Sequence, residues 1–561
     1  MVILTVFAHG LQAGGLGLYW DDAEQLMQGL QGVDYRVLDF IVSDTARSLP
    51  SERPLAYLAF ALTRAAFAFS VGAVHWTLVA WLALDAALLG SLARTIVDDD
   101  WFVFAVGTTF VLYPLAFLQT IWPATIHYHL AWFFASVAML AAGKSGSVDP
   151  RRARWWLACG ALAYATSLLT QEAVGFIPLA FVGLHALSGR RTVRAAITLG
   201  GVFALFALWR TLLLPLYGDQ FYSPSMPFLH PGVVISKALR NATAAALFPW
   251  RSVADQWRSV ADHIVGWTTV AGLGLAFVIG ASTWLVSERL LRSQAPIARD
   301  AAAECADGAG SWRRAAALGV AFLLAGVFAV ALSPINIEMF FQTSYGPRAN
   351  FVVVPGIALA APAVLMVLAR VVRLPRWAVS ALLALLAFVG SLLHFDTKQG
   401  YSWEWAHHKA MLMSLRELAP RVAPDTLIVI ATARDRRAPY SAHYEISSYL
   451  LALYDDWSVM GNTVRHLRFH RDGVDTTDYG SPGRWFPHGV KGPIGTTATQ
   501  LVGRIPYERL LLFDYSTDVL RAVPELEVTA VDGQPIRLSS NPARLRAGPP
   551  LVTPIWLHIT R

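Results

Sequence analysis

Long apolar runs separated by short polar loops dominate the first 395 residues. Eleven of these runs are roughly 17–25 residues long, which is the length at which an α-helix crosses the hydrocarbon core of a bilayer. They lie near residues 1–19, 75–94, 101–118, 126–142, 155–170, 174–188, 195–216, 264–287, 314–333, 351–371 and 377–394. The pattern predicts a polytopic α-helical membrane protein with about eleven transmembrane helices.

The loops between the runs predict the orientation. Basic residues concentrate in the loops 144–154, 190–194 and 370–376, and loops of this kind stay on the cytoplasmic side. The other set of loops then lies outside the cell membrane: 119–126, 171–173, 217–262 and 334–350. The same parity places everything after residue 395 on the extracytoplasmic side.

One further apolar segment, 54–72, has two interpretations. As a span it would reverse the orientation of the Arg-rich loops, and Arg64 at its middle would be costly in hydrocarbon. We therefore expect an amphipathic helix on the outer membrane surface, within an external loop 20–74. The alternative is a twelfth transmembrane helix.

The composition changes after Phe395 to that of a soluble domain of normal size. Helices are predicted at 411–424 and 444–457, and strands at 425–433, 509–516 and 526–533. The expected architecture is thus a transmembrane domain, 1–394, followed by an extracytoplasmic α/β-type domain, 395–561.

Composition supports a membrane location and excludes a nucleic-acid-binding class. The chain is 55% hydrophobic and 15% charged, with a mean hydropathy of +0.46 and 20 Trp residues, many of them beside apolar runs. The net charge of +7 comes from basic residues in short loops rather than from a binding stripe. The two Cys residues give no disulfide framework, and the N-terminus is expected to be an uncleaved first helix.

The candidate chemistry lies in the first external loop. Asp21 and Asp22 follow the first apolar run, and Arg53 closes the same loop. Two carboxylates beside lipid are costly unless they are solvated, paired or used, although they can also simply end a helix at the headgroup boundary. A carboxylate can take a proton from an acceptor hydroxyl, and a guanidinium can hold a phosphate.

Several motifs together resemble the GT-C glycosyltransferases. They are WDD after the first run, RPL at residue 53, and a span that opens with His75 in VHWTLVAWLALDAALL. LLTQEAVGFIPLA is similar to a "TKE…P" turn, with Gln171 where Lys is common. SYGPRANFVVVPGIALA is similar to a segment that opens a late span, with Ala349 where Tyr is usual. The likeness covers roughly residues 15–370 and is closest to the protein O-mannosyltransferase-like and bacterial lipid-linked-sugar branches.

The resemblance implies an inverting glycosyltransferase with a polyprenyl-phosphate sugar donor. Asp22 or Asp21 would be the catalytic base. Arg53, Glu172 and Arg348 would line an external cavity, with Arg348 the better candidate for the lipid phosphate. The acceptor would be a saccharide, a lipid or a protein, and the location a bacterial inner (cell) membrane among membrane lipids. No cofactor is implied for certain, and a divalent metal stays open.

Other polar residues have both a functional and a structural interpretation. His127 and His129 could bind a sugar hydroxyl or phosphate, or lie at the membrane interface. Asp85, inside the second span, should find a partner in the bundle, and Arg210 is expected to extend its head toward the interface. After the last span, the cluster Trp403, Trp405, His407 and His408 is interpreted as an interfacial anchor, with a cavity-facing role as the alternative.

Rival functions are a transporter or flippase of a lipid-linked saccharide and an O-antigen ligase or polymerase-like enzyme. A transporter should show inverted repeats or paired broken helices, and none is found in the sequence. A ligase should concentrate Arg and His in a long late external loop, whereas the acidic pair here comes at the first exit.

Overall fold

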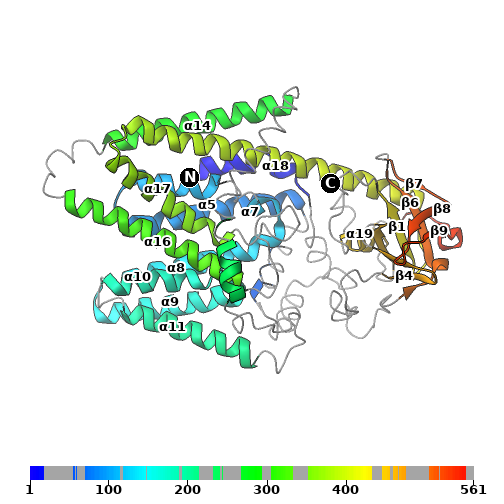
Figure 1. Cartoon of the computed structure of the whole chain (residues 1–561), viewed down its shortest axis with the longest axis horizontal. Coiled ribbons are helices and arrows are strands. Elements are labelled where there is room, and N and C mark those ends of the chain that lie inside the picture. The colour runs from blue at the N-terminus through cyan, green and yellow to red at the C-terminus, as the bar shows by residue number, and fades with distance from the viewer. Residues whose placement is uncertain are drawn as a thin grey trace. The chain divides into compact units, whose positions relative to one another are not determined.

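We describe a computed structural model of the chain (Figure 1). It describes residues 1–17, 55–56, 59, 63, 70–113, 118–146, 148–188, 193–213, 232–240, 243, 267–293, 305–332, 351–432, 445–454, 459–464, 467–475, 504–516 and 519–550. Two compact units are formed. The first comprises 1–14, 43–59 and 75–399, and the second 15–42, 60–74 and 400–561.

The first unit is helical. A short α1 (Val2–Thr5) continues into the π-helix η1 (Val6–Gly10) and the 3-10 turn η2 (Ala13–Gly15). The next helices are α5 (Val71–Ile96), α6 (Asp100–Leu112), α7 (Leu118–Ile121), η4 (Pro123–Thr125) and α8 (Ile126–Ser145). They are followed by α9 (Pro150–Thr170), η5 (Glu172–Val174), α10 (Phe176–Ser188), α11 (Val193–Leu208) and the π-helix η7 (Trp209–Leu213). The last four are α14 (Trp267–Ser293), α16 (Cys305–Ala331), α17 (Val354–Val371) and α18 (Arg376–Leu418).

Seven helices in the described part of the chain are long and apolar enough to cross a membrane. Every one of the eleven predicted runs coincides with helix. The four that fall outside the seven are Val2–Gly15, Asp100–Leu112 and Glu172–Ala186, which are shorter, and α9, which begins with an Arg-rich turn. The helix α8 packs on both α9 and α10, α11 packs on the same two helices, and α10 also packs on α16 (Figure 1). These helices indicate a membrane protein.

Glycines allow the closest helix packing, as is common between transmembrane helices. A Cβ at Gly319 or Gly326 of α16 would overlap the backbone of the 352–360 region, and one at Gly356 would overlap α16 in return. A Cβ at Gly390 of α18 would overlap the carbonyl of Leu112. The backbones therefore touch at these points without side chains between them.

One end of the first unit gathers the basic helix termini. Trp101 at the start of α6 donates to Ser287 Oγ of α14 over 2.7 Å, and Ser287 contacts Ser380 of α18 at 3.0 Å. Trp312 of α16 packs against Trp101, with the Arg370 guanidinium 5.5 Å above its ring. Five helix ends thus meet at one level. Their exposed cations include Arg289, Arg292, Arg313, Arg314, Arg370, Arg373 and Arg376.

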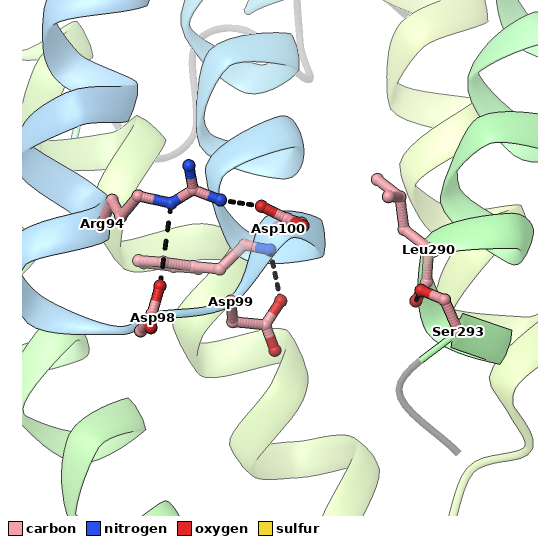
Figure 2. A network of polar contacts seen from close by, with 7 residues as sticks. Arg94, Asp98, Asp99, Asp100, Leu290 and Ser293 are labelled. Carbon is pink, nitrogen blue, oxygen red and sulfur yellow. Dashed lines mark hydrogen bonds and ion pairs between the residues drawn. The ribbon is translucent and has the colours of Figure 1, made fainter. Parts of the chain in front are cut away.

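The acidic run 98–100 lies at this same end and is partly compensated by Arg94 and by the start of α6 (Figure 2). Arg94 pairs with both Asp98 and Asp100, and Asp99 caps α6 by accepting from Phe102 N over 2.9 Å. An acidic side chain is favourable at a helix N-terminus. The run therefore fits an end whose surroundings are basic.

Of the segment 54–72, the structure describes Leu55, Ala56, Ala59, Thr63 and 70–72. The first four are helical, and the small residues at 56, 59 and 63 are buried. The spacing of three and four places them on one face of a helix. The surface helix stays a prediction.

The α18 helix corrects one sequence interpretation. A last span ending at 394 and a separate helix at 411–424 were expected, but a single 43-residue helix runs from Arg376 to Leu418. It begins directly after Pro375 and ends shortly before Pro420, and no proline interrupts it between these positions. Its length of about 64 Å is twice what the hydrocarbon core needs.

The second unit is a strand-containing domain. Its central strand β1 (Leu427–Ala431) pairs in parallel with β2 (Met460–Thr463) on one side and β6 (Leu510–Asp514) on the other. The helix α19 (Glu445–Tyr454) connects β1 to β2, and β7 (Arg521–Ala522) adds antiparallel to β6. The strands and the helix predicted at 425–433, 509–516 and 444–457 are confirmed.

Two smaller sheets complete this unit. The strands β3 (Arg468–His470), β4 (Gly473–Asp475) and β5 (Arg504–Ile505) form one, and β8 (Glu525–Thr529) pairs with β9 (Pro535–Ser539) in the other. The short turns η11 (Tyr507–Arg509) and η12 (Pro542–Arg544) flank them. Leucine and valine side chains from β1 and β6 share one core with these sheets. Parallel strands are usually covered on both faces, and here β1 is buried almost throughout.

Candidate functional site

Polar side chains gather at the end of the first unit that lies opposite the basic helix termini. His75 is about 28 Å from Arg94 along α5, and Lys398 is about 33 Å from Arg376 along α18, at 1.5 Å per residue. The α8 histidines, Glu172 in η5 and Arg210 in η7 lie at the corresponding helix ends. The spacing of the two levels matches the hydrocarbon thickness of about 30 Å.

The predicted site residues divide into two groups. Asp21, Asp22, Arg53 and Arg348 lie outside the described residues, and so their roles stay predictions. Glu172, His127 and His129 are described, and each has a defined position at this polar end.

Glu172 pairs with Arg210. Arg210 Nη2 lies 3.3 Å from Glu172 Oε1, and the two side chains remain 25% and 24% exposed. The expected extension of Arg210 toward the membrane interface stays a prediction, and its guanidinium lies beside the carboxylate that opens η5. A pair at this intermediate exposure keeps contact with solvent, so either group can also contact a substrate.

Gln171 precedes this pair and is fully buried. Neither its amide nitrogen nor its amide oxygen has a hydrogen-bond partner in the described part of the chain. The turn around it is held by Tyr164, which donates to the Gly175 carbonyl over 2.5 Å. Buried amides are nearly always paired, so the Gln171 amide is an exception within this turn.

The two histidines of α8 have different environments. His129 Nδ1 lies 2.6 Å from Asp85 Oδ2 of α5, and both side chains are completely buried. This confirms that Asp85 finds a partner in the bundle. His127 instead packs its ring against Tyr128, which in turn contacts Phe351. His129 therefore joins α5 to α8, and only His127 retains a candidate role in binding.

A third polar cluster joins the first helical segment to α18. Lys398 Nζ donates to the His9 carbonyl over 2.7 Å and to His9 Nδ1 over 3.1 Å. His9 Nε2 lies 3.0 Å from the Val111 carbonyl, so Nε2 carries the proton and Nδ1 accepts. Thr120 Oγ1 also reaches His9 Nδ1 at 3.0 Å, and the Thr120 carbonyl accepts from His75 at 3.1 Å.

The sequence interpretation missed this cluster. His9 sits in a weakly patterned first run and Lys398 follows the last one, 389 positions away. The rings of His394 and His9 contact each other at a tilt, with centroids 4.6 Å apart. A lysine inside what proves to be one long helix was the available signal, since intramembrane charges are rarely placed without a role.

The aromatic and histidine group on α18 divides by helix face in the second unit. Trp405 and His408 are buried and face Tyr449 of α19, with ring centroids 6.1 and 6.4 Å away. Trp403 and His407 stack on each other on the exposed face, 3.7 Å apart. Only the second pair is placed as an interfacial anchor requires.

No group of three His, Cys, Asp or Glu side chains suited to a metal ion occurs among the described residues. What the described part of this end does offer is one partly exposed acid–base pair, one unpartnered amide and two buried polar links. This set can bind polar or anionic groups and can hold helix ends in place.

No protein-family model, curated protein or solved structure matches the chain.

Proposed function

We propose that this protein is an integral-membrane glycosyltransferase of the GT-C type with about eleven transmembrane helices. It transfers a sugar from a polyprenyl-phosphate donor to an acceptor outside the cell membrane. The observation that carries the proposal is the Glu172–Arg210 pair at the polar end of the first unit. Its carboxylate belongs to the TQE segment on which the family resemblance partly rests.

Three features support this reading. The charged pair and the unpartnered Gln171 amide lie at the helix ends opposite the basic ones, which the positive-inside rule assigns to the cytoplasm. The chain leaves the first helical segment toward Asp21 from this same end. A donor phosphate and its sugar hydroxyls would find a guanidinium, a carboxylate and an amide here.

The proposed reaction is a single displacement. Asp22 or Asp21 takes the proton of the acceptor hydroxyl, and the acceptor oxygen attacks the anomeric carbon. The bond from that carbon to the phosphate oxygen breaks, and its electron pair leaves with the polyprenyl phosphate. Arg348 and Arg53 stabilise the departing charge, which is most effective when they are held in place beforehand. The anomeric centre is inverted.

The eleven-helix topology is testable on its own. We expect reporter enzymes fused after Gly146 and Ser293 to be active in the cytoplasm, and one fused after Leu418 to be active outside it. A cytoplasmic reporter after Leu418 would contradict the topology and with it the external site.

The catalytic assignment is tested with the purified full chain in lipid nanodiscs and a panel of polyprenyl-phosphate sugars. Wild type should release polyprenyl phosphate, and Asp22→Asn or Asp21→Asn should lose most of that activity. Asp98→Asn serves as the matched control, because it removes an aspartate charge at the opposite end. Full activity in both Asp21→Asn and Asp22→Asn would disprove the assignment. Movement of lipid-linked sugar across vesicles without donor consumption would favour a transporter.

A further inference from the structure

The helix α18 holds the chain that leads to Asp21–Asp22. In the first unit, His9 is fixed to Lys398 by two hydrogen bonds, and Gln12 Nε2 donates to the Phe395 carbonyl over 3.3 Å. In the second unit, a Cβ placed on Gly15 would lie 3.1 Å from Ser402 Oγ. A Cβ placed on Gly17 would overlap the Trp405 ring.

The contact at Gly17 leaves no room for a side chain. Trp405 is 4% exposed, and Tyr449 and Lys409 pack around its ring. The ring therefore has little freedom to move away. Gly14, three residues earlier, is exposed, and a Cβ there would meet nothing within 4 Å. Of these two positions, only position 17 requires a glycine, because the backbone there lies too close to Trp405 of α18 for a side chain.

The contact at His9 is specific for a different reason. The Lys398 side chain is buried, and both of its hydrogen bonds in the described part of the chain go to His9. In an apolar bundle, exchanging such a partner leaves a buried polar group unpaired. The first segment is thus held at one position against α18 and cannot slide by a turn.

We propose that α18 positions the catalytic base, with Lys398 and Trp405 as the positioning residues. They fix residues 9–17, and Asp21 follows Gly17 by only four positions. This inference rests on the proposed function, since it assumes that Asp21 or Asp22 is the base. A displacement of a reacting group by about 1 Å can cost on the order of a hundredfold in rate.

The test compares Gly17→Ala with Gly14→Ala in the purified full chain. Gly17→Ala should lower kcat about a hundredfold with little change in KM for the donor, while Gly14→Ala keeps wild-type kinetics. Because Leu is smaller than Trp, the double variant Gly17→Ala/Trp405→Leu should regain a large part of the lost kcat. Wild-type kcat in Gly17→Ala, or equal losses in Gly17→Ala and Gly14→Ala, would overturn the inference.

Lys398 is tested by Lys398→Met, which keeps the length of the side chain and removes its donors. We expect kcat to fall at least tenfold with KM nearly constant. Lys144→Met is the control, because Lys144 lies in the last turn of α8, at the opposite end of the first unit from Lys398. A rise in KM with unchanged kcat would overturn the positioning role.

The docking of residues 9–17 on α18 is also measured without any substrate. The melting temperatures of wild type, the two single variants and the double variant at positions 17 and 405 form a double-mutant cycle. A coupling between the two positions supports docking, and strict additivity contradicts it. If wild type transfers no sugar from any donor while this coupling is present, the proposed function has failed and the docking has not.

Discussion

The first unit contains two acid–base pairs of the same general composition in opposite environments. Asp85 and His129 meet at 2.6 Å with no exposure at all, whereas Glu172 and Arg210 meet at 3.3 Å and keep about a quarter of their surface. Burial excludes solvent and substrate from the first pair, so its contribution is to join α5 to α8. The second pair gains less from its own attraction but remains able to contact a ligand.

The comparison separates two uses of charge in a membrane protein. A buried pair is costly to form, and breaking it leaves an uncompensated polar group. A partly exposed pair is screened by solvent and contributes little to stability. We therefore expect substitutions at Asp85 to act on folding, and substitutions at Glu172 to act on activity.

The largest effect is expected from Asp85→Ala. It leaves His129 buried without its partner and should lower the free energy of unfolding by about 3–5 kcal/mol. Unfolding in detergent, followed by circular dichroism, measures this loss. Asp98→Ala, an aspartate with a 93% exposed side chain, should change stability far less. Equal losses in the two variants would remove the distinction between the pairs.

The next effect concerns Glu172→Gln. Loss of the carboxylate removes the Glu172–Arg210 ion pair and should reduce the rate of sugar transfer roughly ten- to a hundredfold. The free energy of unfolding should change by less than about 1 kcal/mol, because the pair is solvated. Parallel measurement of transfer rate and melting temperature tests both statements. If the variant unfolds easily but transfers sugar normally, Glu172 acts on folding, as Asp85 does, and not on activity.

A smaller change is expected when both members of the buried pair are replaced. The double variant Asp85→Leu/His129→Leu should be within about 1 kcal/mol of wild type, since apolar packing can substitute for a buried ion pair. Comparison of its unfolding curve with that of Asp85→Ala gives the loss of stability that is caused by burying His129 without Asp85. If the double variant were as unstable as the single one, the pair itself would be stabilising.

The smallest effect is expected at Asp472 in the second unit, which extends the comparison to a more exposed pair. Arg504 Nη1 lies 2.6 Å from Asp472 Oδ1, and this hydrogen bond lowers the pKa of Asp472 below its ordinary value of 3.8. The associated stability is complete above that value and is lost as the pH falls below it. Melting curves between pH 6 and pH 2 should show a slight acid loss in wild type that Asp472→Asn lacks.

The sequence predicts the helices well, because each apolar run has to become a helix in lipid. All eleven runs coincide with helix, and seven helices in the described part of the chain are long and apolar enough for a span. Partnerships were harder to predict. Asp85 required a partner, but nothing in the chain pointed to His129, 44 positions away. Arg210 and Glu172 were predicted separately and turn out to be paired.

The continuity of α18 was missed for a physical reason. His394 and Lys398 give the region after the last apolar run a soluble composition, and charged residues normally mark the end of a span. In the structure both residues are buried against His9, and the polar head of Lys398 is hydrogen-bonded to His9 inside the bundle. The composition records which groups are polar, while the structure decides whether they face solvent.

The place of β1 in the middle of its sheet has a consequence for synthesis. Its two parallel partners come from later in the chain, and β6 begins more than eighty residues after β1 begins. At about 5–20 residues per second, the ribosome needs on the order of several seconds to complete that interval. During this time the central strand presents an open edge, which is a template for pairing with other chains. The newly made domain thus depends on a late strand to close its own sheet.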